Sequence, residues 1–225
     1  MQAMLTLLSQ YDVLGAFWVN IQLTLWSALF SLILGVVLVM MRISPIPSLR
    51  AFASGFVEFF KNMPLTIIMV FMLLGAFVQL RFQFSSTFSS NFYWLAITGL
   101  SLYTSVFVCE SLRSGINTVP LGQAEAARSL GLGFFQTAGL IVLPQAFRGS
   151  VAPLGNTLIA LLKNSTVAAA CSVATETSTL MKTMIEYNAS SIVAVFMIFA
   201  IGYVILIIPI GLLTTWLSNT LAVRR

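Results

Sequence analysis

The sequence predicts an all-α integral membrane protein, and three observations support that prediction. The chain has 225 residues, of which 59% are hydrophobic and only 8% are charged. A soluble domain of this size carries roughly 25% charged residues, so a water-soluble surface is excluded. The apolar residues also fall into runs of about 20, the length that a membrane-spanning helix needs. Most Lys and Arg residues stand at the ends of these runs, so the net charge of +5 does not indicate nucleic-acid binding.

Four apolar runs are long enough to cross a membrane. They are Ala16–Met41, Pro64–Leu80 with a helical lead-in at Phe52–Asn62, Asn91–Val108, and Ile192–Leu217. Arg42 ends the first run and Arg224 and Arg225 end the last. These runs predict the first, second, third and last spans of one membrane domain, residues 1–225.

A further span between the third and the last is less simple. Phe134–Leu143 is short, and Pro144 should kink or stop a helix there. Val151–Leu162 extends only about 18 Å at roughly 1.5 Å per residue, but it crosses a membrane if it continues through Ala174. Alternatively, Phe134–Leu162 forms one longer kinked span. We therefore expect about five transmembrane helices.

The distribution of basic residues predicts the orientation. One side would hold Arg42, Arg50, Lys61, Arg113, Arg128, Arg148, Arg224 and Arg225, and the other Arg81 and Lys182. Because Lys and Arg concentrate on the cytoplasmic side, we expect the N-terminus outside and the C-terminus in the cytoplasm of a multi-pass cell-membrane protein.

Residues 117–146, between spans three and four, would then face the cytoplasm. Asn117 or Thr118 can cap a helix with Pro120 in its first turn, which would run over Leu121–Leu130. Gly131 can close it in a left-handed conformation. So short a helix needs a surface to pack on. It either lies flat at the lipid headgroups or docks in a protein groove, and its many alanines favour the groove.

Several motifs resemble one family of transporters. Glu125-Ala126-Ala127, followed by Gly131 and by Leu143-Pro144, resembles the "EAA" loop of ABC importer membrane subunits. Three further stretches resemble the polar amino acid subgroup, the histidine, glutamine and glutamate permeases: Glu58–Leu65, Glu110–Ile116 and Lys163–Thr166. Lys61–Thr66 departs from the subgroup's usual pattern and is closest to the glutamate permeases of actinobacteria. The likeness covers most of the chain from about Gly15.

This resemblance implies a function for the cytoplasmic segment. It would form a coupling helix in a cleft of an ATP-binding subunit, through Glu125, Ala126, Ala127, Arg128, Leu130 and Gly131. Leu121, Ala124 and Leu130 would fill an apolar groove, and Glu125 and Arg128 would form charge-assisted hydrogen bonds at its edge. The implied partners are a cytoplasmic ABC ATPase dimer, a second permease subunit, identical or homologous, an extracytoplasmic amino-acid-binding protein and membrane lipid, without nucleic acid. The transported solute would be glutamate.

The sequence supplies no catalytic chemistry of its own. It has no G-x-x-x-x-G-K-[ST] motif for nucleotide phosphates and no His. Cys109 and Cys171 are far apart in apolar sequence, which indicates small buried residues rather than a disulfide or a metal site. We therefore expect no catalytic residue, cofactor or metal, with ATP hydrolysed by a partner.

A candidate substrate path lies at the break in the fourth span. Lys163 stands about midway in it, and an ionisable residue at that depth indicates function. Asn164, Ser165 and Thr166 supply polar groups, as broken helices do in transporters. Ser165 or Thr166 could cap a helix resuming at Val167, whose N-terminus would favour an anion. Alternatively the span ends at Leu162 and Lys163 extends to the membrane surface.

Other polar residues have more than one interpretation. Asn156 either lies on the substrate path or joins helices in the membrane. Glu110 and Arg113 share a helix face and are expected to pair. Glu176, Lys182 and Glu186 lie on an outer loop, either solvated or in contact with a binding protein.

Two other functional classes make different predictions about the sequence. An ATP-independent secondary carrier or channel subunit predicts acidic sites within the spans and internal repeats, and neither is clear. A membrane enzyme would need a nucleophile motif or a carboxylate cluster, and neither is evident.

Overall fold

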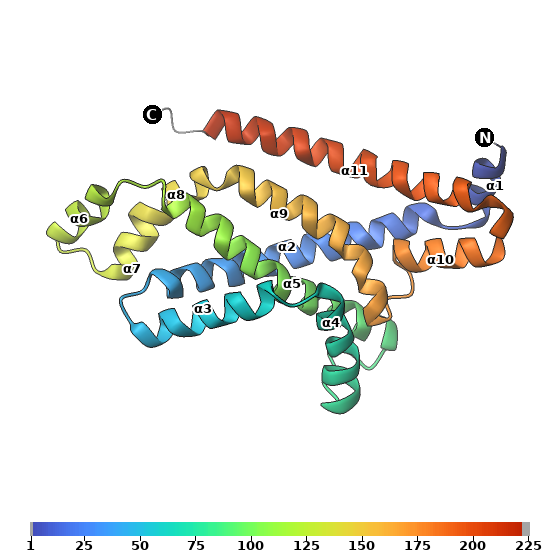
Figure 1. The fold of residues 1–225 in the computed structure, drawn as a ribbon, viewed down its shortest axis with the longest axis horizontal. Coiled ribbons are helices and arrows are strands. Elements are labelled where there is room, and N and C mark those ends of the chain that lie inside the picture. Colours follow the sequence, from blue (N-terminus) through green and yellow to red (C-terminus); the bar gives the residue numbers. More distant parts are fainter. Residues whose placement is uncertain (1, 222–225) are drawn as a thin grey trace. The chain divides into compact units, whose positions relative to one another are not determined.

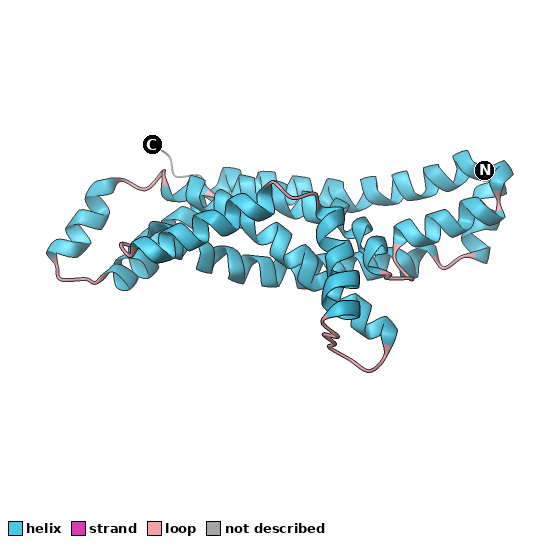
Figure 2. Cartoon of the chain, turned by 60° about the horizontal axis from the view of Figure 1, so that its bottom comes forward, coloured by secondary structure: helices cyan, strands magenta, loops and turns pink. Residues whose placement is uncertain are grey.

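The computed structural model describes residues 2–221, and every regular element in that range is a helix (Figures 1 and 2). The all-α prediction is therefore confirmed. Arg224 and Arg225, used above for the orientation, lie outside the described residues. The elements in chain order are α1 (Gln2–Gln10), α2 (Val13–Ile43), α3 (Pro47–Lys61), α4 (Leu65–Val70), η1 (Phe71–Gln79), α5 (Phe88–Ile116), α6 (Leu121–Ser129), α7 (Phe134–Thr137), η2 (Ala138–Val142), α8 (Leu143–Gly149), α9 (Val151–Asn164), η3 (Ser165–Cys171), α10 (Thr177–Tyr187), η4 (Ala189–Ser191) and α11 (Ile192–Leu221).

Within residues 2–221, three helical segments are long and apolar enough to cross a membrane. They are α2 with 31 residues, α5 with 29, and Ala189–Leu221 with 33. The number rises to four if α3 and the α4–η1 segment, which meet at a break, form one span. The remaining candidate is α9 with 14 residues followed by the 3₁₀ turns of η3 with 7. The count of five spans stays a prediction.

The helix through Pro144 continues where the sequence predicts a kink or a stop. α7, η2 and α8 follow one another without a loop, and the wider π-helical turns of η2, Ala138–Val142, come directly before Leu143 and Pro144. A π-type turn accommodates a residue that has no N–H to donate. The helix ends at Gly149, and a turn at Ser150 separates it from α9.

The described residues form two compact units, each built from three stretches of chain. Unit 1 takes the residues up to Ala28, then Pro64–Leu100 and Ile159–Pro209. Unit 2 takes Leu29–Met63, Ser101–Leu158 and the residues from Ile210. The long helices α2, α5, α9 and α11 therefore contribute residues to both units.

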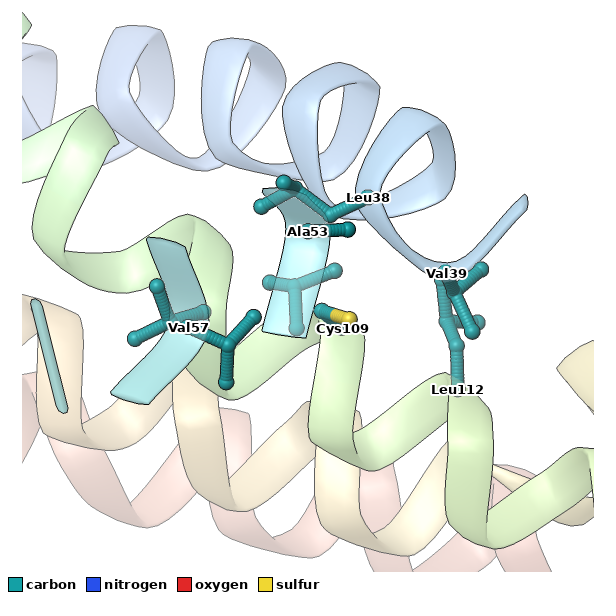
Figure 3. Close-up of a cluster of buried hydrophobic side chains, with 8 residues drawn as sticks. Leu38, Val39, Ala53, Val57, Cys109 and Leu112 are labelled. Carbon is teal, nitrogen blue, oxygen red and sulfur yellow. The ribbon is translucent and has the colours of Figure 1, made fainter. Parts of the chain in front are cut away.

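The core of unit 2 joins α2, α3 and α5. Figure 3 shows its labelled side chains, which are Leu38 and Val39 of α2, Ala53 and Val57 of α3, and Cys109 and Leu112 of α5. Ala53 and Val57 are four residues apart, so they share one face of α3. Each fully buried Val or Leu stabilises the fold by about 1.5–3 kcal/mol. Cys109 and Cys171 are both buried free thiols, as the sequence predicts.

The core of unit 1 joins α1, α2, α10 and α11. Its buried members are Leu7, Val13, Phe17, Met184, Val195, Ile198 and Phe199. The Phe17 ring also lies against Tyr203 of α11, with centroids 5.3 Å apart. At the edge of this core the Asn188 amide donates to the Tyr11 hydroxyl at 3.0 Å. These contacts fix α11 beside the first turns of α2.

Candidate functional site

A helix, α6, is present where the coupling helix is predicted, but its N-terminus differs from the prediction. Pro120 is the residue before the first helical turn, with φ −60° and ψ 130°, and no side chain caps the helix. Asn117 and Thr118 close α5 instead. The Thr118 hydroxyl donates to the Gly115 carbonyl at 2.7 Å, and the Asn117 N–H donates to the Arg113 carbonyl at 3.1 Å. Asn117 and Thr118 therefore serve the C-terminus of α5, because the last carbonyls of a helix need hydrogen-bond donors.

α6 leaves most of its surface uncovered. Within Leu121–Ser129 only Ala127 is buried. Leu121 is 82% exposed, and Leu130, directly after the helix, is 84% exposed. Glu125, Ala126 and Arg128 are exposed as well. Two large apolar side chains at the two ends of a short helix thus have no cover from their own chain, as expected of a surface that another polypeptide meets.

The chain leaves α6 through a left-handed residue. Gly131 has φ +85°, the conformation predicted for it, and its N–H donates to the Arg128 carbonyl at 2.9 Å. The Leu132 N–H donates to the Ala127 carbonyl at 3.1 Å. Only a residue without Cβ adopts this φ at low cost. The chain then enters α7. Within unit 2, α6 lies at one end (Figure 1).

A side-chain hydrogen bond connects α6 to α8 within unit 2. The Gln145 side chain of α8 donates to the Gln123 side chain of α6 and, at 2.8 Å, to the Ile141 carbonyl. α8 also crosses the end of α5 closely. A Cβ added to Gly115 would overlap the Ala146 carbonyl oxygen and the Ser150 hydroxyl oxygen. Gly115 therefore sets how near α5 and α8 approach.

An ion pair joins α2 to α5 in unit 2. Arg42 pairs with Glu110, and Arg113 approaches the same carboxylate at 3.9 Å. The predicted Glu110–Arg113 pair is therefore present, but Arg42 is the nearer partner of Glu110.

The predicted break in the fourth span is a change of helix type. α9 ends at Asn164, and Ser165–Cys171 continues as a tight 3₁₀ segment. The Ser165 hydroxyl donates back to the Leu162 carbonyl and the Thr166 hydroxyl to the Lys163 carbonyl, both at 2.8 Å. These hydroxyls complete the end of α9, so the prediction that they cap a new helix is wrong. The anion site expected at that helix N-terminus loses its basis.

The five predicted path residues differ in exposure. Lys163 and Asn156 are exposed on α9, Asn164 and Thr166 are half-buried, and Ser165 is fully buried. Asn156 therefore does not join helices within this chain. Ser165 cannot contact a transported solute in this conformation, because no part of its side chain reaches the surface.

Ser165 belongs to a buried polar network in unit 1 that the sequence analysis did not find. The Asn20 amide of α2 donates to the Ser165 hydroxyl at 2.8 Å and to the Tyr203 hydroxyl of α11 at 3.2 Å. The side-chain amide oxygen of Asn20 accepts from the Thr177 N–H at 2.9 Å. The Thr177 and Tyr203 hydroxyls share a hydrogen bond of 2.6 Å. The signal in the sequence for this network is Asn20 itself, which stands inside an apolar run. A polar side chain there is costly in a membrane unless it is hydrogen-bonded.

Glu176 is buried next to this network. It lies outside the candidate spans, in the loop before α10, and is 0% exposed. Its carboxylate accepts from the Ser178 N–H at 2.7 Å and from the Thr179 N–H, and so caps α10. Burial raises the pKa of the Glu176 carboxyl, while these N–H groups oppose the shift. Both interpretations of Glu176 as a solvated or docking residue are wrong, because its side chain is fully buried within this chain.

A hollow of about 580 Å³ is partly lined by the same loop. Its lining is contributed by Val19 and Gln22 of α2, by Thr87–Ser90, Phe92 and Tyr93 around the start of α5, and by Ser172–Thr175. Lys163–Thr166 are not part of this lining.

Comparison with known proteins decides the family. The model of the binding-protein-dependent transport system inner membrane component family matches residues 29–223. The chain belongs to this family. Among its relatives, the glutamate transport system permease protein GluC of Corynebacterium efficiens is 49% identical over 219 residues, covering 95% of this chain and 96% of that protein. GluC of Corynebacterium glutamicum is 48% identical with the same coverage.

A solved structure has the same fold as this family member. The crystal structure of an amino acid ABC transporter with histidines matches 96% of this chain and 97% of its own, with a TM-score of 0.80 and 22% identity. The likeness shows that this chain has the fold of that ABC transporter chain. The resemblance deduced from the EAA loop is confirmed at the level of the family.

Proposed function

We propose that this chain is the membrane-spanning permease subunit of an ATP-driven importer of glutamate, located in the cell membrane. The observation that supports the solute is the 49% identity, over 95% of the chain, to a relative named as a glutamate transport permease. The family's description, a component of binding-protein-dependent transport, supports an extracytoplasmic amino-acid-binding protein as one partner.

The exposed face of α6 supports docking on a cytoplasmic ABC ATPase dimer. Leu121 and Leu130 would enter an apolar groove there, while Glu125 and Arg128 would bond at its edge. Gly131 would hold the return of the chain in the required conformation. Burying two leucines would contribute about 1.5–3 kcal/mol each to the complex. ATP would be hydrolysed by the ATPase and not by this chain.

A second permease subunit, identical or homologous, would complete the translocation path. In each subunit Lys163, Asn164 and Thr166 would line that path, together with Asn156. These side chains are polar and at least partly open to the surface of the single chain, as a solute-lining residue must be. Ser165 would not line the path, because its side chain is fully buried. The orientation would be N-terminus outside and C-terminus cytoplasmic, with the whole chain acting as a single permease domain.

The test is ATP-dependent uptake by the co-purified complex in proteoliposomes. Labelled glutamate, glutamine and arginine would be compared, with wild type, Glu125→Arg and Lys163→Ala. We expect glutamate alone to accumulate, Glu125→Arg to abolish uptake with loss of the ATPase subunit, and Lys163→Ala to abolish glutamate uptake while the complex stays intact.

The alternative, an ATP-independent secondary carrier, predicts uptake by this chain without any ATPase. Glu176 is a buried carboxyl of the kind that such a carrier uses, but its bonds to backbone N–H groups give it the role of a helix cap. Accumulation of glutamate in vesicles that hold only this chain would overturn the ATP-driven proposal.

A further inference from the structure

Asn20 is the centre of the buried network in unit 1, and both ends of its amide are bonded. Its NH₂ group serves Ser165 and Tyr203, and its carbonyl oxygen serves the Thr177 N–H. The residue is 0% exposed. A buried amide is costly unless it is bonded, and one that is bonded on three sides has a single favourable orientation. Asn20 therefore fixes η3, the start of α10 and α11 relative to α2.

Ser165 is the point at which this network reaches the predicted path. It follows Asn164 directly and is the first residue of the 3₁₀ segment. Its hydroxyl accepts from Asn20 on one side and donates to the Leu162 carbonyl on the other, each at 2.8 Å. The position where α9 changes into η3 is thus tied to α2 by one bond.

Buried positions one turn away from Asn20 and Ser165 hold apolar side chains. Leu23, one turn along α2, and Ala168, one turn along η3, are buried without any polar contact being needed. The Asn20–Ser165 pair adds a directional bond where burial alone would not set the exact position of the turn. This difference indicates a role in geometry rather than in bulk stability.

We propose that Asn20 is a positioning residue for solute passage, acting through Ser165. The pair sets where Lys163, Asn164 and Thr166 stand, so that these side chains present a fixed arrangement to the transported amino acid. Ser165 itself does not touch the solute, because it is buried within the single chain. The inference rests on the proposed function, since it takes the Lys163–Thr166 turn as part of the path.

The decisive quantity is the amount of labelled glutamate imported per ATP hydrolysed. It would be measured in proteoliposomes that hold the complete complex, with saturating glutamate-loaded binding protein. Poor folding lowers uptake and hydrolysis together and leaves this ratio unchanged, whereas a displaced path lowers uptake alone. Ser165→Ala removes one acceptor of the Asn20 amide and keeps the bonds of Asn20 to Thr177 and Tyr203.

Tyr203→Phe is the matched control. It removes the other acceptor of the same amide and also the bond to the Thr177 hydroxyl, but it keeps the bond between Asn20 and Ser165. We expect Ser165→Ala to lower the ratio about three- to tenfold, the size of one net hydrogen bond. Tyr203→Phe should leave the ratio at the wild-type value.

A wild-type ratio in Ser165→Ala would overturn the proposal, and so would an equal loss in both variants. If Ser165→Ala does not assemble, Ser165→Cys replaces it, because a thiol nearly keeps the volume of the hydroxyl and accepts only a weak hydrogen bond from the Asn20 amide. An unchanged ratio in Ser165→Cys would equally overturn the proposal. Absence of ATP-dependent uptake in wild type would instead show that the proposed function is wrong.

Discussion

The side chain of Arg42 on α2 pairs with the carboxylate of Glu110 on α5, with 11% of Arg42 and 32% of Glu110 exposed. Arg113 approaches the same carboxylate at 3.9 Å but is 50% exposed. Arg42 interacts with Glu110 more strongly than Arg113 does, because water screens the charge of the more buried guanidinium less. The Arg42–Glu110 pair therefore contributes more to unit 2 than the Glu110–Arg113 pair within one helix.

Glu110→Gln should destabilise the protein, because it leaves the Arg42 charge with a neutral partner. We expect a loss of about 1–3 kcal/mol in the free energy of unfolding. Arg113→Gln should cost no more than about 0.5 kcal/mol, as exposed pairs do. Thermal unfolding in detergent would be followed with a thiol-reactive dye, since Cys109 and Cys171 are buried until the chain unfolds. Equal losses in the two variants would contradict the ranking.

Two glycines in neighbouring segments should respond oppositely to alanine. Gly115→Ala places a Cβ against the Ala146 carbonyl and the Ser150 hydroxyl, so α5 and α8 must separate. Such overpacking typically costs about 1–3 kcal/mol, and we expect Gly115→Ala to lose about this much free energy of unfolding. Gly122→Ala, on α6, meets nothing within 4 Å and should be neutral or stabilising through helix propensity. The same dye-based melting curve measures both, and a destabilised Gly122→Ala would show that α6 is covered.

The features that the sequence predicts correctly depend on local composition. The runs that became α2, α5 and α11 are recognisable because lipid requires long apolar helices. Gly131 is recognisable because few other residues adopt its φ of +85°. Burial of Cys109 and Cys171 follows from their apolar surroundings. The exposed residues of α6 were identified by resemblance, and their docking remains a prediction.

The features that the sequence does not predict depend on contacts between distant residues. Asn20 and Ser165 are 145 positions apart, so nothing near either residue indicates the bond. Glu176 is a charged residue in a loop, which predicts a solvated side chain, whereas the folded chain buries it completely. The hydroxyls of Ser165 and Thr166 suit either a helix start or a helix end, and the orphan carbonyls of α9 determine the outcome.

Glu176 should make stability depend on pH. Its pKa is raised by burial, so between the usual carboxyl pKa, about 4.3, and the raised value the folded state binds more protons than the unfolded state. The free energy of unfolding therefore falls as pH rises through this window, and the contribution is fully present below it. Glu176→Gln, which cannot ionise, should remove this fall.

Tryptophan-fluorescence melting between about pH 4 and pH 8 measures the effect. Glu186→Gln is the control, because Glu186 lies on α10, the helix that Glu176 caps, but is exposed. The difference in melting temperature between wild type and Glu176→Gln should change with pH in the stated direction. A constant difference across the range would refute the role of the Glu176 proton.

Leu121 should contribute to ATPase docking without contributing to the fold. Because its side chain is 82% exposed in the single chain, Leu121→Asp should leave the melting temperature of the isolated permease unchanged. In a groove, however, an unpaired carboxylate would replace an apolar contact worth about 1.5–3 kcal/mol, so the ATPase retained on co-purification should fall at least tenfold. Leu121→Met, which keeps the apolar volume, should retain the ATPase. If Leu121→Asp retained it as well, α6 would dock through another face or would lie at the lipid headgroups.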